Sequence, residues 1–348
     1  METLTVNAST PYPVHIGPGL LEKAGELIAG VTSSRTCAVI TDTTVEKLYA
    51  APVCRSLQEA GFQVCLHAFP AGEQSKNINT YGGMLEFLAE NKLTRSDFVV
   101  ALGGGVTGDM AGFAAATYQR GVDYIQMPTT FLAASDSSVG GKTAIDLAAG
   151  KNLAGAFHQP KMVICDTDTF RTLPPDAFAD GMAETLKHGL IADGDFYRFL
   201  MTGDVRARMD QVVRRNVEIK AAVVGEDEKE HGKRKLLNFG HTLGHAYELA
   251  GHYEKWTHGQ AVAAGMVKAA ELGTALGVTP TGTAERIGVL LGCFGLPVAI
   301  GCTGADYAAA VGLDKKGAGA DITLVLLERM GRAVLRKMPK EQLLELLA

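Results

Sequence analysis

Residues 97–109 of the chain, DFVVALGGGVTGD, decide its fold class. The apolar run at 98–102 predicts a strand that is buried on both faces, as strands of a parallel sheet are. Three glycines follow the run, and the sequence from 110 to 118 favours a helix. The order of strand, glycine loop and helix satisfies G-x-G-x-x-G, a pattern in which a pyrophosphate approaches bare backbone at a helix N-terminus. We therefore expect a nucleotide-binding α/β unit.

The residues before this stretch repeat the same alternation of elements. Apolar runs at 36–42 and 62–69 enclose a helix-like segment at 45–60, which is the order typical of a parallel sheet. Asp42 closes the first run, where its carboxylate can bind a nucleotide ribose or cap the next helix. The glycine loop lies about 100 residues into the chain rather than at the first strand. The unit is therefore predicted to be a variant of the Rossmann fold.

The residues after the glycine loop suggest a second part of the nucleotide site. A strand and turn at 124–130 ends in Thr129 and Thr130, whose hydroxyls could bond a nucleotide. The segment DSSVGGKT at 136–143 ends like a phosphate-binding loop. Asp136 stands where GxxxxGK[ST] requires its first glycine, however, so a Walker site is not predicted.

The charge of the chain limits its partners. The net charge is −5 and there is no long basic run, which argues against nucleic acid or an anionic membrane surface as a partner. Any anionic ligand must therefore be bound by a local pocket. Lys142, Lys151 and Asn152 are candidates for such a pocket, although solvated surface lysines are the commoner alternative.

Cysteine usage and the N-terminus predict a compartment. The six cysteines include no C-x-x-C pair, and residues 1–10 lack the features of a signal peptide. The longest apolar stretch, at 290–302, is short and interrupted by glycine and proline, so no segment is predicted to span a membrane. We expect a cytoplasmic protein with reduced thiols.

The length of the chain predicts two domains. With 348 residues it exceeds the size that one hydrophobic core usually organises. The segment 166–175 ends in two prolines and is interpreted as an interdomain connection. From 177 onward the periodicity is helical until 321–327. We expect a Rossmann-like α/β domain at 1–170 and a mostly α-helical domain at 171–348.

Two histidines mark a candidate metal site in the second domain. In LLNFGHTLGHA (236–246), His241 and His245 are four residues apart and lie on one face of the predicted helix. A pair of half-buried helix histidines is the alternative, since the glutamate of HExxH is absent. Glu184 and His258 are possible further ligands. A carboxylate with two imidazoles leaves coordination positions open, as in a catalytic zinc site that polarises an alcohol.

The charged groups near these histidines have ordinary explanations too. Glu184 and Lys187 are three residues apart, so they could form a helix-surface ion pair rather than part of a site. The charged run at 226–235 is typical of a solvated loop. It leads directly into the histidine segment, so that Glu230 and Arg234 could also face the site.

Taken together, several motifs identify a family. The chain resembles the 3-dehydroquinate synthases, which belong to the sugar phosphate cyclases, from about residue 42 to residue 316. The resemblance implies the dehydroquinate synthase-like fold, with the active site in the cleft between the domains. It rests on GGGVTGDMAGF (103–113), PTT (128–130), DSSVGGKTAID (136–146), GKNLAGAFHQP (150–160), GMAETLKHGLI (181–191), LLNFGHTLGHA (236–246) and HGQAVAAGM (258–266).

The resemblance implies roles for individual residues. Zinc or cobalt would be bound by Glu184, His241 and His258, which replaces His245 as a ligand. NAD would be bound by Asp42, Glu73, Lys76, Gly104, Gly105, Val106, Asp109, Thr129, Thr130, Lys142, Lys151, Thr169 and Thr172. Substrate and catalytic groups would be Arg120, Asp136, Lys142, Asn152, Lys187, Lys220, Arg234, Asn238, Glu230 and His245, with the last two transferring protons. A late lysine completes the set, and the choice between Lys315 and Lys316 is open.

The implied activity is that of a carbon–oxygen lyase acting on phosphate, in aromatic amino acid biosynthesis. The sugar acid phosphate DAHP would become 3-dehydroquinate by transient oxidation with NAD, loss of phosphate, re-reduction and ring closure. The resemblance also implies a homodimer. The alternatives are a related sugar phosphate cyclase, a metal-dependent polyol dehydrogenase and a noncatalytic nucleotide-binding protein. Gln260 departs from the family, which has glutamate there, and we expect it beside His258, where it would alter metal affinity.

Overall fold

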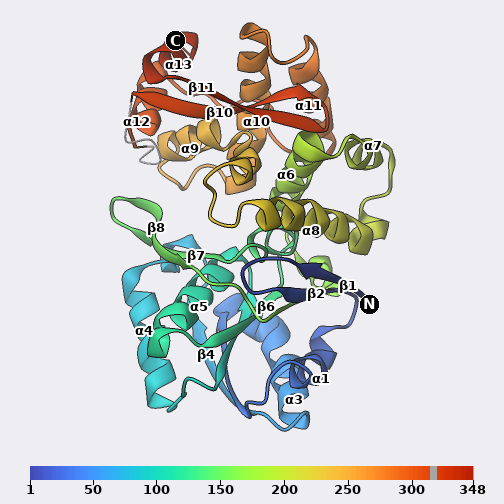
Figure 1. Ribbon diagram of the computed structural model, residues 1–348, viewed down its shortest axis with the longest axis vertical. Helices are drawn as coiled ribbons and strands as arrows, with labels where there is room; N and C mark the ends of the chain where they lie inside the picture. The colour runs from blue at the N-terminus through green and yellow to red at the C-terminus, as the bar shows by residue number, and fades with distance from the viewer. Residues whose placement is uncertain (314–319, 348) are drawn as a thin grey trace. The chain divides into compact units, whose positions relative to one another are not determined.

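The computed structural model describes residues 1–313 and 320–347 (Figure 1). The chain divides into two units, of which the first comprises Met1–Pro174 and Met209–Lys229 and the second comprises Pro175–Arg208 and Glu230–Ala348. The expected division at residue 170 did not include the return of 209–229 to the first unit. This segment forms α8 (Met209–Glu226), whose apolar residues, among them Val212 and Val213, are buried.

A seven-stranded sheet forms the centre of the first unit. Its strands lie in the order β1 (Glu2–Val6), β2 (Tyr12–Gly17), β9 (Met162–Asp166), β6 (Asp123–Pro128), β5 (Phe98–Gly103), β3 (Thr36–Asp42) and β4 (Gln63–Phe69). Every pair is parallel except β1 with β2. From β3 the chain first adds β4 on one side and then β5 on the other. The strand order therefore reverses between β3 and β5, and ligands of open α/β sheets bind at such a reversal.

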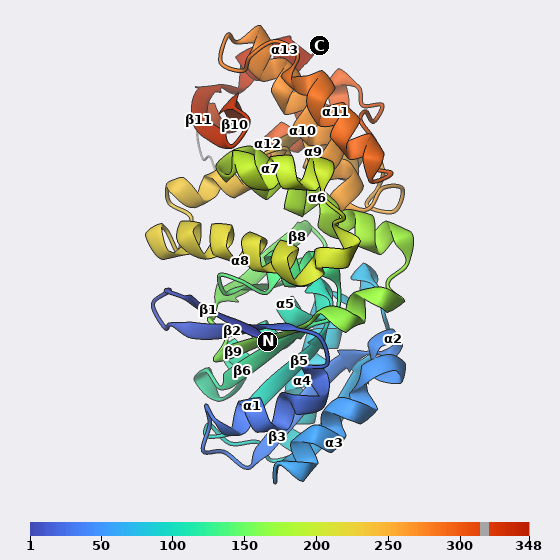
Figure 2. The same ribbon diagram turned by 90° about the vertical axis from the view of Figure 1, so that its right-hand side faces the viewer.

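Helices cover both faces of this sheet (Figure 2). On one face α1 (Ala24–Ala29) and α3 (Ala51–Glu59) pack on Val100 and Leu102 of β5, and on the other α4 (Ile78–Glu90) and α5 (Gly105–Thr117) pack on Val99 and Ala101. Because successive side chains of a strand point to opposite faces, burial on both sides explains the unbroken apolar run at 98–102.

Shorter elements complete the first unit. A hairpin of β7 (Lys142–Leu147) and β8 (Gly150–Phe157) is inserted between β6 and β9. The short helical segments are η1 (Leu21–Lys23), α2 (Thr43–Val45), η2 (Glu46–Ala50), η3 (Glu73–Ser75), η4 (Tyr118–Arg120), η5 (Ala133–Ser137) and η6 (Thr167–Thr172).

The described part of the second unit is mostly helical, as the sequence predicted. Its helices are α6 (Pro175–Ala192), α7 (Gly194–Thr202), η7 (Arg206–Arg208), η8 (Lys233–Asn238), α9 (His241–Ala250), α10 (His258–Ala275), α11 (Thr283–Cys293), α12 (Gly304–Leu313) and α13 (Lys340–Leu347). One antiparallel ribbon, of β10 (Asp321–Arg329) and β11 (Arg332–Pro339), accompanies them. Among the described residues, no helix has the length and apolarity that crossing a bilayer requires.

A glycine contact lets α9 and α10 approach closely. A Cβ atom at Gly265 of α10 would lie 2.1 Å from the carbonyl oxygen of Gly240, which precedes α9. Gly240 has a φ of +80°, a conformation that glycine adopts without strain. Because both positions are glycine, the backbone at the start of α9 rests directly on α10.

Candidate functional site

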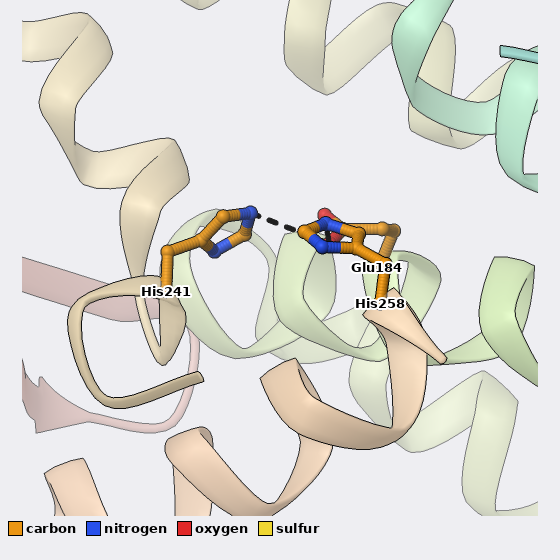
Figure 3. A group of neighbouring side chains, drawn as sticks. All are labelled: Glu184, His241 and His258. Carbon is orange, nitrogen blue, oxygen red and sulfur yellow. Dashed lines mark ion pairs between the residues drawn. The ribbon is translucent and has the colours of Figure 1, made fainter. Parts of the chain in front are cut away.

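Three helices of the second unit bring Glu184, His241 and His258 together (Figure 3). Glu184 lies on α6, and each histidine is the first residue of its helix, α9 or α10. The Nε2 atoms of His241 and His258 lie 3.5 and 3.6 Å from Oε1 of Glu184. Each residue offers a ligand atom within 4.8 Å of the other two.

These distances fit a divalent cation between the three side chains. Two ligands about 2.0–2.1 Å from a tetrahedral zinc ion are roughly 3.3–3.4 Å apart. The observed separations of 3.5 and 3.6 Å are close to this value and too long for direct hydrogen bonds. Oε1 of Glu184 is fully buried. Lys187 pairs with the other carboxylate oxygen, Oε2, so a cation in this position would give the buried carboxylate a positive partner on the side of Oε1 as well.

The outward-facing nitrogens of both imidazoles are directed at acceptors. Nδ1 of His241 lies 3.2 Å from the carbonyl oxygen of Phe239, and Nδ1 of His258 lies 3.5 Å from Oε1 of Glu248. A proton on Nδ1 of His241 would be donated to the carbonyl oxygen, and a proton on Nδ1 of His258 would face the carboxylate at ion-pair distance. Either proton leaves the Nε2 lone pair for a metal. Histidine ligands in metal sites are held in the same way.

Burial and charge shift the pKa values of the two histidines in opposite directions. Burial lowers the pKa of His241 to about 3 in the metal-free site, although Glu184 raises it, and the charge of Lys187 contributes to the lowering. Burial alone would lower the pKa of His258 too, but the carboxylates of Glu184 and Glu248 raise it to about 10. At neutral pH the metal-free site therefore has a neutral His241 and a protonated His258.

The N-terminus of α10 is fixed by its own capping residues. Thr257 accepts a hydrogen bond from the backbone N–H of Gln260, whose side chain accepts one from the N–H of Thr257 at 3.1 Å. Thr257 also donates to Asp180 of α6 at 2.5 Å. The expectation that Gln260 lies beside His258 as its outer partner is wrong, because a residue at the third helical position reaches back to the cap.

The remaining charged residues of the second unit are unevenly exposed. Lys187 is 1% exposed and pairs with Glu184, so this is not the surface ion pair that the sequence allowed. Arg234 in η8 is also 1% exposed. Asn238 donates to Oε1 of Glu230 at 2.5 Å. His245 is exposed, and in the described part of the chain it is not a member of the candidate metal cluster.

In the first unit, the glycine loop and Asp42 lie where the strand order reverses. The glycine loop follows β5, and Asp42 ends the neighbouring β3. Asp42 caps α2 through the N–H groups of Thr44 and Val45, so the capping interpretation of this carboxylate holds, while its contact with a ribose stays a prediction. Thr130 follows β6 and adjoins the loop, since a Cβ atom at Gly104 would lie 3.0 Å from its methyl carbon.

A buried lysine connects the nucleotide side of the first unit to a predicted substrate residue. Lys76 is 5% exposed, and its Nζ lies 2.6 Å from both Oδ2 of Asp109 and Oδ1 of Asn152. Burial alone would lower the pKa of Lys76, but the carboxylate of Asp109 raises it. Lys76 is therefore an ammonium ion at neutral pH and holds Asn152 in place.

Two further predicted pairs lie in the first unit. Lys220 of α8 contacts Asp136 of η5, with Nζ 2.7 Å from Oδ1 and 2.6 Å from the backbone carbonyl. Lys151 is 4.0 Å from the carboxylate of Glu73. The return of α8 to the first unit thus places Lys220 next to a residue more than eighty positions earlier in the sequence.

Most of the remaining predicted residues lie on other elements of the first unit. Arg120 follows α5, at the end opposite to the glycine loop, about 20 Å along the helix. Lys142 is exposed at the start of β7. The hydroxyls of Thr169 and Thr172 donate to the backbone carbonyls of Asp166 and Thr169, respectively. Lys315 and Lys316 lie outside the described residues.

Sequence reasoning missed Asp180 and Glu248. Asp180 precedes Glu184 by one turn of α6, and Glu248 follows His241 by two turns of α9. Both act on α10 across tertiary contacts, which no local pattern indicates. The capping pair could be predicted from the sequence, because Thr257 and Gln260 match the S/T-x-x-E/Q capping box.

The sequence also matches known protein families. Models described as 3-dehydroquinate synthase N-terminal and 3-dehydroquinate synthase C-terminal match residues 66–180 and 181–317, which together exceed half of the chain. The chain belongs to the 3-dehydroquinate synthase family. It is 42% identical to the 3-dehydroquinate synthase of Pelotomaculum thermopropionicum, covering 100% of this chain and 96% of that one. It is 44% identical to the 3-dehydroquinate synthase of Bordetella pertussis, covering 96% of each.

Solved structures of sugar phosphate cyclases are similar to this family member over nearly its whole length. A 2-deoxy-scyllo-inosose synthase, complexed with carbaglucose-6-phosphate, NAD+ and Co2+, has a TM-score of 0.87 at 27% identity, covering 99% of both chains. A 2-epi-5-epi-valiolone synthase of Streptomyces hygroscopicus, with NAD+ and Zn2+ bound, has a TM-score of 0.86 at 26% identity, covering 96% of this chain and 95% of that one. The expected dehydroquinate synthase-like fold is confirmed.

Proposed function

We propose that this chain converts 3-deoxy-D-arabino-heptulosonate 7-phosphate (DAHP) to 3-dehydroquinate and phosphate, with NAD and a divalent metal ion, zinc or cobalt. One observation carries the proposal. Glu184, His241 and His258 converge beside the buried Lys187, in a chain 42% identical over its whole length to a 3-dehydroquinate synthase. Bound NAD would reversibly oxidise the C5 hydroxyl of the substrate, and the metal bound by these three residues would polarise that hydroxyl.

The second unit would hold the charged parts of the substrate. Lys187 and Arg234 are both 1% exposed, and such burial is unusual for cations unless anions accompany them. Fixed positive charges of this kind bind phosphate and carboxylate groups without reorganisation during the reaction. Lys187 would thus serve the substrate while it also neutralises Glu184.

Proton transfer would fall to Glu230 and His245. The amide of Asn238 donates to Glu230, which fixes the orientation of this carboxylate. A base held in one orientation can remove a proton from a substrate carbon, provided the substrate lies within hydrogen-bond reach. His245 is exposed, so it can exchange protons with water.

The first unit would bind NAD and part of the substrate. The glycine loop would receive the pyrophosphate, with Asp42, Thr129 and Thr130 near it. Asn152 would contact the substrate while Lys76 and Asp109 hold it in place. Lys220 and Asp136 would contribute a further substrate contact. We propose that the active site requires both units, as the family resemblance implies.

The test is a parallel assay of phosphate and NADH. Purified protein is incubated with DAHP, NAD and zinc, and released phosphate and NADH absorbance are followed together. We expect phosphate in proportion to DAHP consumed, with no accumulation of NADH, because the cofactor is regenerated in each turnover. NADH formed one for one with substrate would instead indicate a polyol dehydrogenase.

A second substrate separates this function from that of the related cyclases. Glucose 6-phosphate has a phosphate but no carboxylate, and a cyclase for hexose phosphates would release phosphate from it. We expect turnover of DAHP alone, because Asn152, Lys187, Arg234 and Asn238 together favour a carboxylate substrate. We also expect a homodimer, which light scattering would report as about twice the 36.7 kDa of one chain.

A further inference from the structure

A buried carboxylate outside the three candidate ligands faces the metal cluster. Glu248 lies on α9, two turns after His241, and its side chain is 3% exposed. Its Oε1 atom is 3.5 Å from Nδ1 of His258, on the side of the ring opposite to Glu184. The helix that carries one candidate ligand therefore also carries the outer partner of another.

The two imidazoles differ in how firmly packing holds them. The side chain of His241 is 13% exposed, and the carbonyl oxygen of Phe239 receives its Nδ1. The side chain of His258 is 36% exposed, so packing leaves its ring more freedom to turn. Among the described contacts of Nδ1 of His258, the carboxylate of Glu248 is the group that would fix the ring.

The neighbouring polar residues Asp180 and Gln260 make other contacts. Asp180 accepts from the hydroxyl of Thr257 and so holds the backbone at the start of α10. Gln260 uses its side chain in the capping box. The two nitrogens of the His258 ring face Glu184 and Glu248 instead.

We propose that Glu248 is a positioning residue, which holds the His258 ring so that Nε2 points at the metal and which increases the basicity of that nitrogen. The inference rests on the proposed metal site of Glu184, His241 and His258. A carboxylate behind a histidine ligand fixes both the tautomer and the orientation of the ring, and its loss commonly weakens metal binding by about 10–100-fold.

The experiment measures zinc binding to metal-free protein by competition with a chromophoric chelator. We expect Glu248→Gln, which keeps the shape of the side chain and removes its charge, to raise the zinc dissociation constant by about 10–100-fold. Glu285→Gln, the same change at an exposed position of α11, is the matched control and should leave the constant unchanged. A wild-type protein that binds no zinc would overturn the proposed function, whereas a Glu248→Gln protein that binds as tightly as wild type would overturn only this inference.

The visible spectrum of the cobalt-loaded protein separates positioning from a general structural role. If Glu248 orients His258, the ligand-field bands of Co2+ change in Glu248→Gln but not in Glu285→Gln. Unchanged bands, together with a metal-affinity loss that follows only from lower thermal stability, would contradict the inference. Should Glu248→Gln fail to fold, Glu248→Asp provides the same comparison. Glu248→Asp keeps the charge but moves the carboxylate away from His258, so we expect a smaller loss of zinc affinity than in Glu248→Gln. Wild-type affinity together with wild-type Co2+ bands in this variant would count against the proposal.

Discussion

The hydroxyl of Thr257 lies 2.5 Å from Oδ1 of Asp180 and joins the first turn of α10 to α6. Thr257→Ala removes this contact together with the helix cap, so we expect the free energy of unfolding to fall by about 1–2 kcal/mol. Urea denaturation of the metal-free protein measures the change. Thr274→Ala, which removes a hydroxyl bonded to a carbonyl within the same helix, should change it by less than about 0.5 kcal/mol. Equal losses in the two variants would contradict a special role for the Asp180 contact.

The contact of Gly265 with Gly240 predicts a second effect. Gly265→Ala would place a methyl group 2.1 Å from a backbone oxygen, so α9 must move away from α10. We expect the unfolding free energy to fall by about 1–3 kcal/mol and zinc binding to weaken, because the movement separates His241 from His258. Gly292→Ala on α11 is the control, since nothing lies within 4 Å of the added methyl group. Undiminished zinc binding in Gly265→Ala would show that the helix contact does not set the ligand geometry.

The glycine loop predicts an effect on NAD binding. A Cβ atom at Gly104 would lie 3.0 Å from Thr130 and occupy the backbone surface that a pyrophosphate would approach. We expect Gly104→Ala to weaken NAD binding at least about tenfold, with an unfolding free energy within about 1 kcal/mol of wild type. Calorimetric titration with NAD and urea denaturation give the two values. Gly82→Ala on α4, with open space around the new methyl group, should bind NAD normally. Normal binding by Gly104→Ala would exclude this approach of the cofactor.

Lys187 should matter more for turnover than for folding. Lys187→Met keeps most of the buried volume and removes the charge that would meet a substrate anion. We expect kcat/KM for DAHP to fall by at least about a hundredfold, which corresponds to roughly 3 kcal/mol. The zinc-loaded protein should melt within a few degrees of wild type, since the metal can still neutralise Glu184. Parallel losses of activity and melting temperature would contradict a role in catalysis.

Metal binding should release a proton. The carboxylates of Glu184 and Glu248 raise the pKa of His258 to about 10 in the metal-free protein, whereas a metal requires the neutral ring. Zinc binding at pH 7 should therefore release about one proton, and calorimetry in buffers of different ionisation enthalpy measures it. Because the folded pKa is raised, the protonated ring stabilises the metal-free protein fully below the unfolded pKa of 6.5, and this contribution disappears as pH rises through about 10. Binding without proton release would contradict a protonated His258.

The elements that the sequence predicted well are those with local causes. The strand, glycine loop and helix around residue 103 follow from burial and backbone freedom within a short segment, and the structure has them as β5 and α5. β2 pairs with β9, which lies more than a hundred residues later in the sequence. α8 belongs to the first unit through contacts with elements that lie more than fifty residues earlier. No periodicity within either segment specifies such a partner.

The residues of the candidate site also divide into those that a local pattern predicts and those that depend on contacts between distant segments. Spacing on one helix suggested His241 with His245, but the ligand geometry comes from the first residues of two different helices, His241 and His258. The family motifs pointed to this pair, which the structure brings together with Glu184. Glu248 and Asp180 became evident only from their tertiary contacts. Gln260 illustrates the reverse case, since a local capping rule explains it better than proximity to the metal.

The return of α8 to the first unit has a consequence for biosynthesis. A ribosome must translate α6 and α7, which belong to the other unit, before the nascent chain contains the last helix of the first. Expression of residues 1–174 alone would leave β1, β2 and η5 without the helix that they contact, and Asp136 would lack its lysine. Such a fragment should be prone to aggregation. The two units are therefore not interchangeable modules, and a truncation that removes one should damage the other.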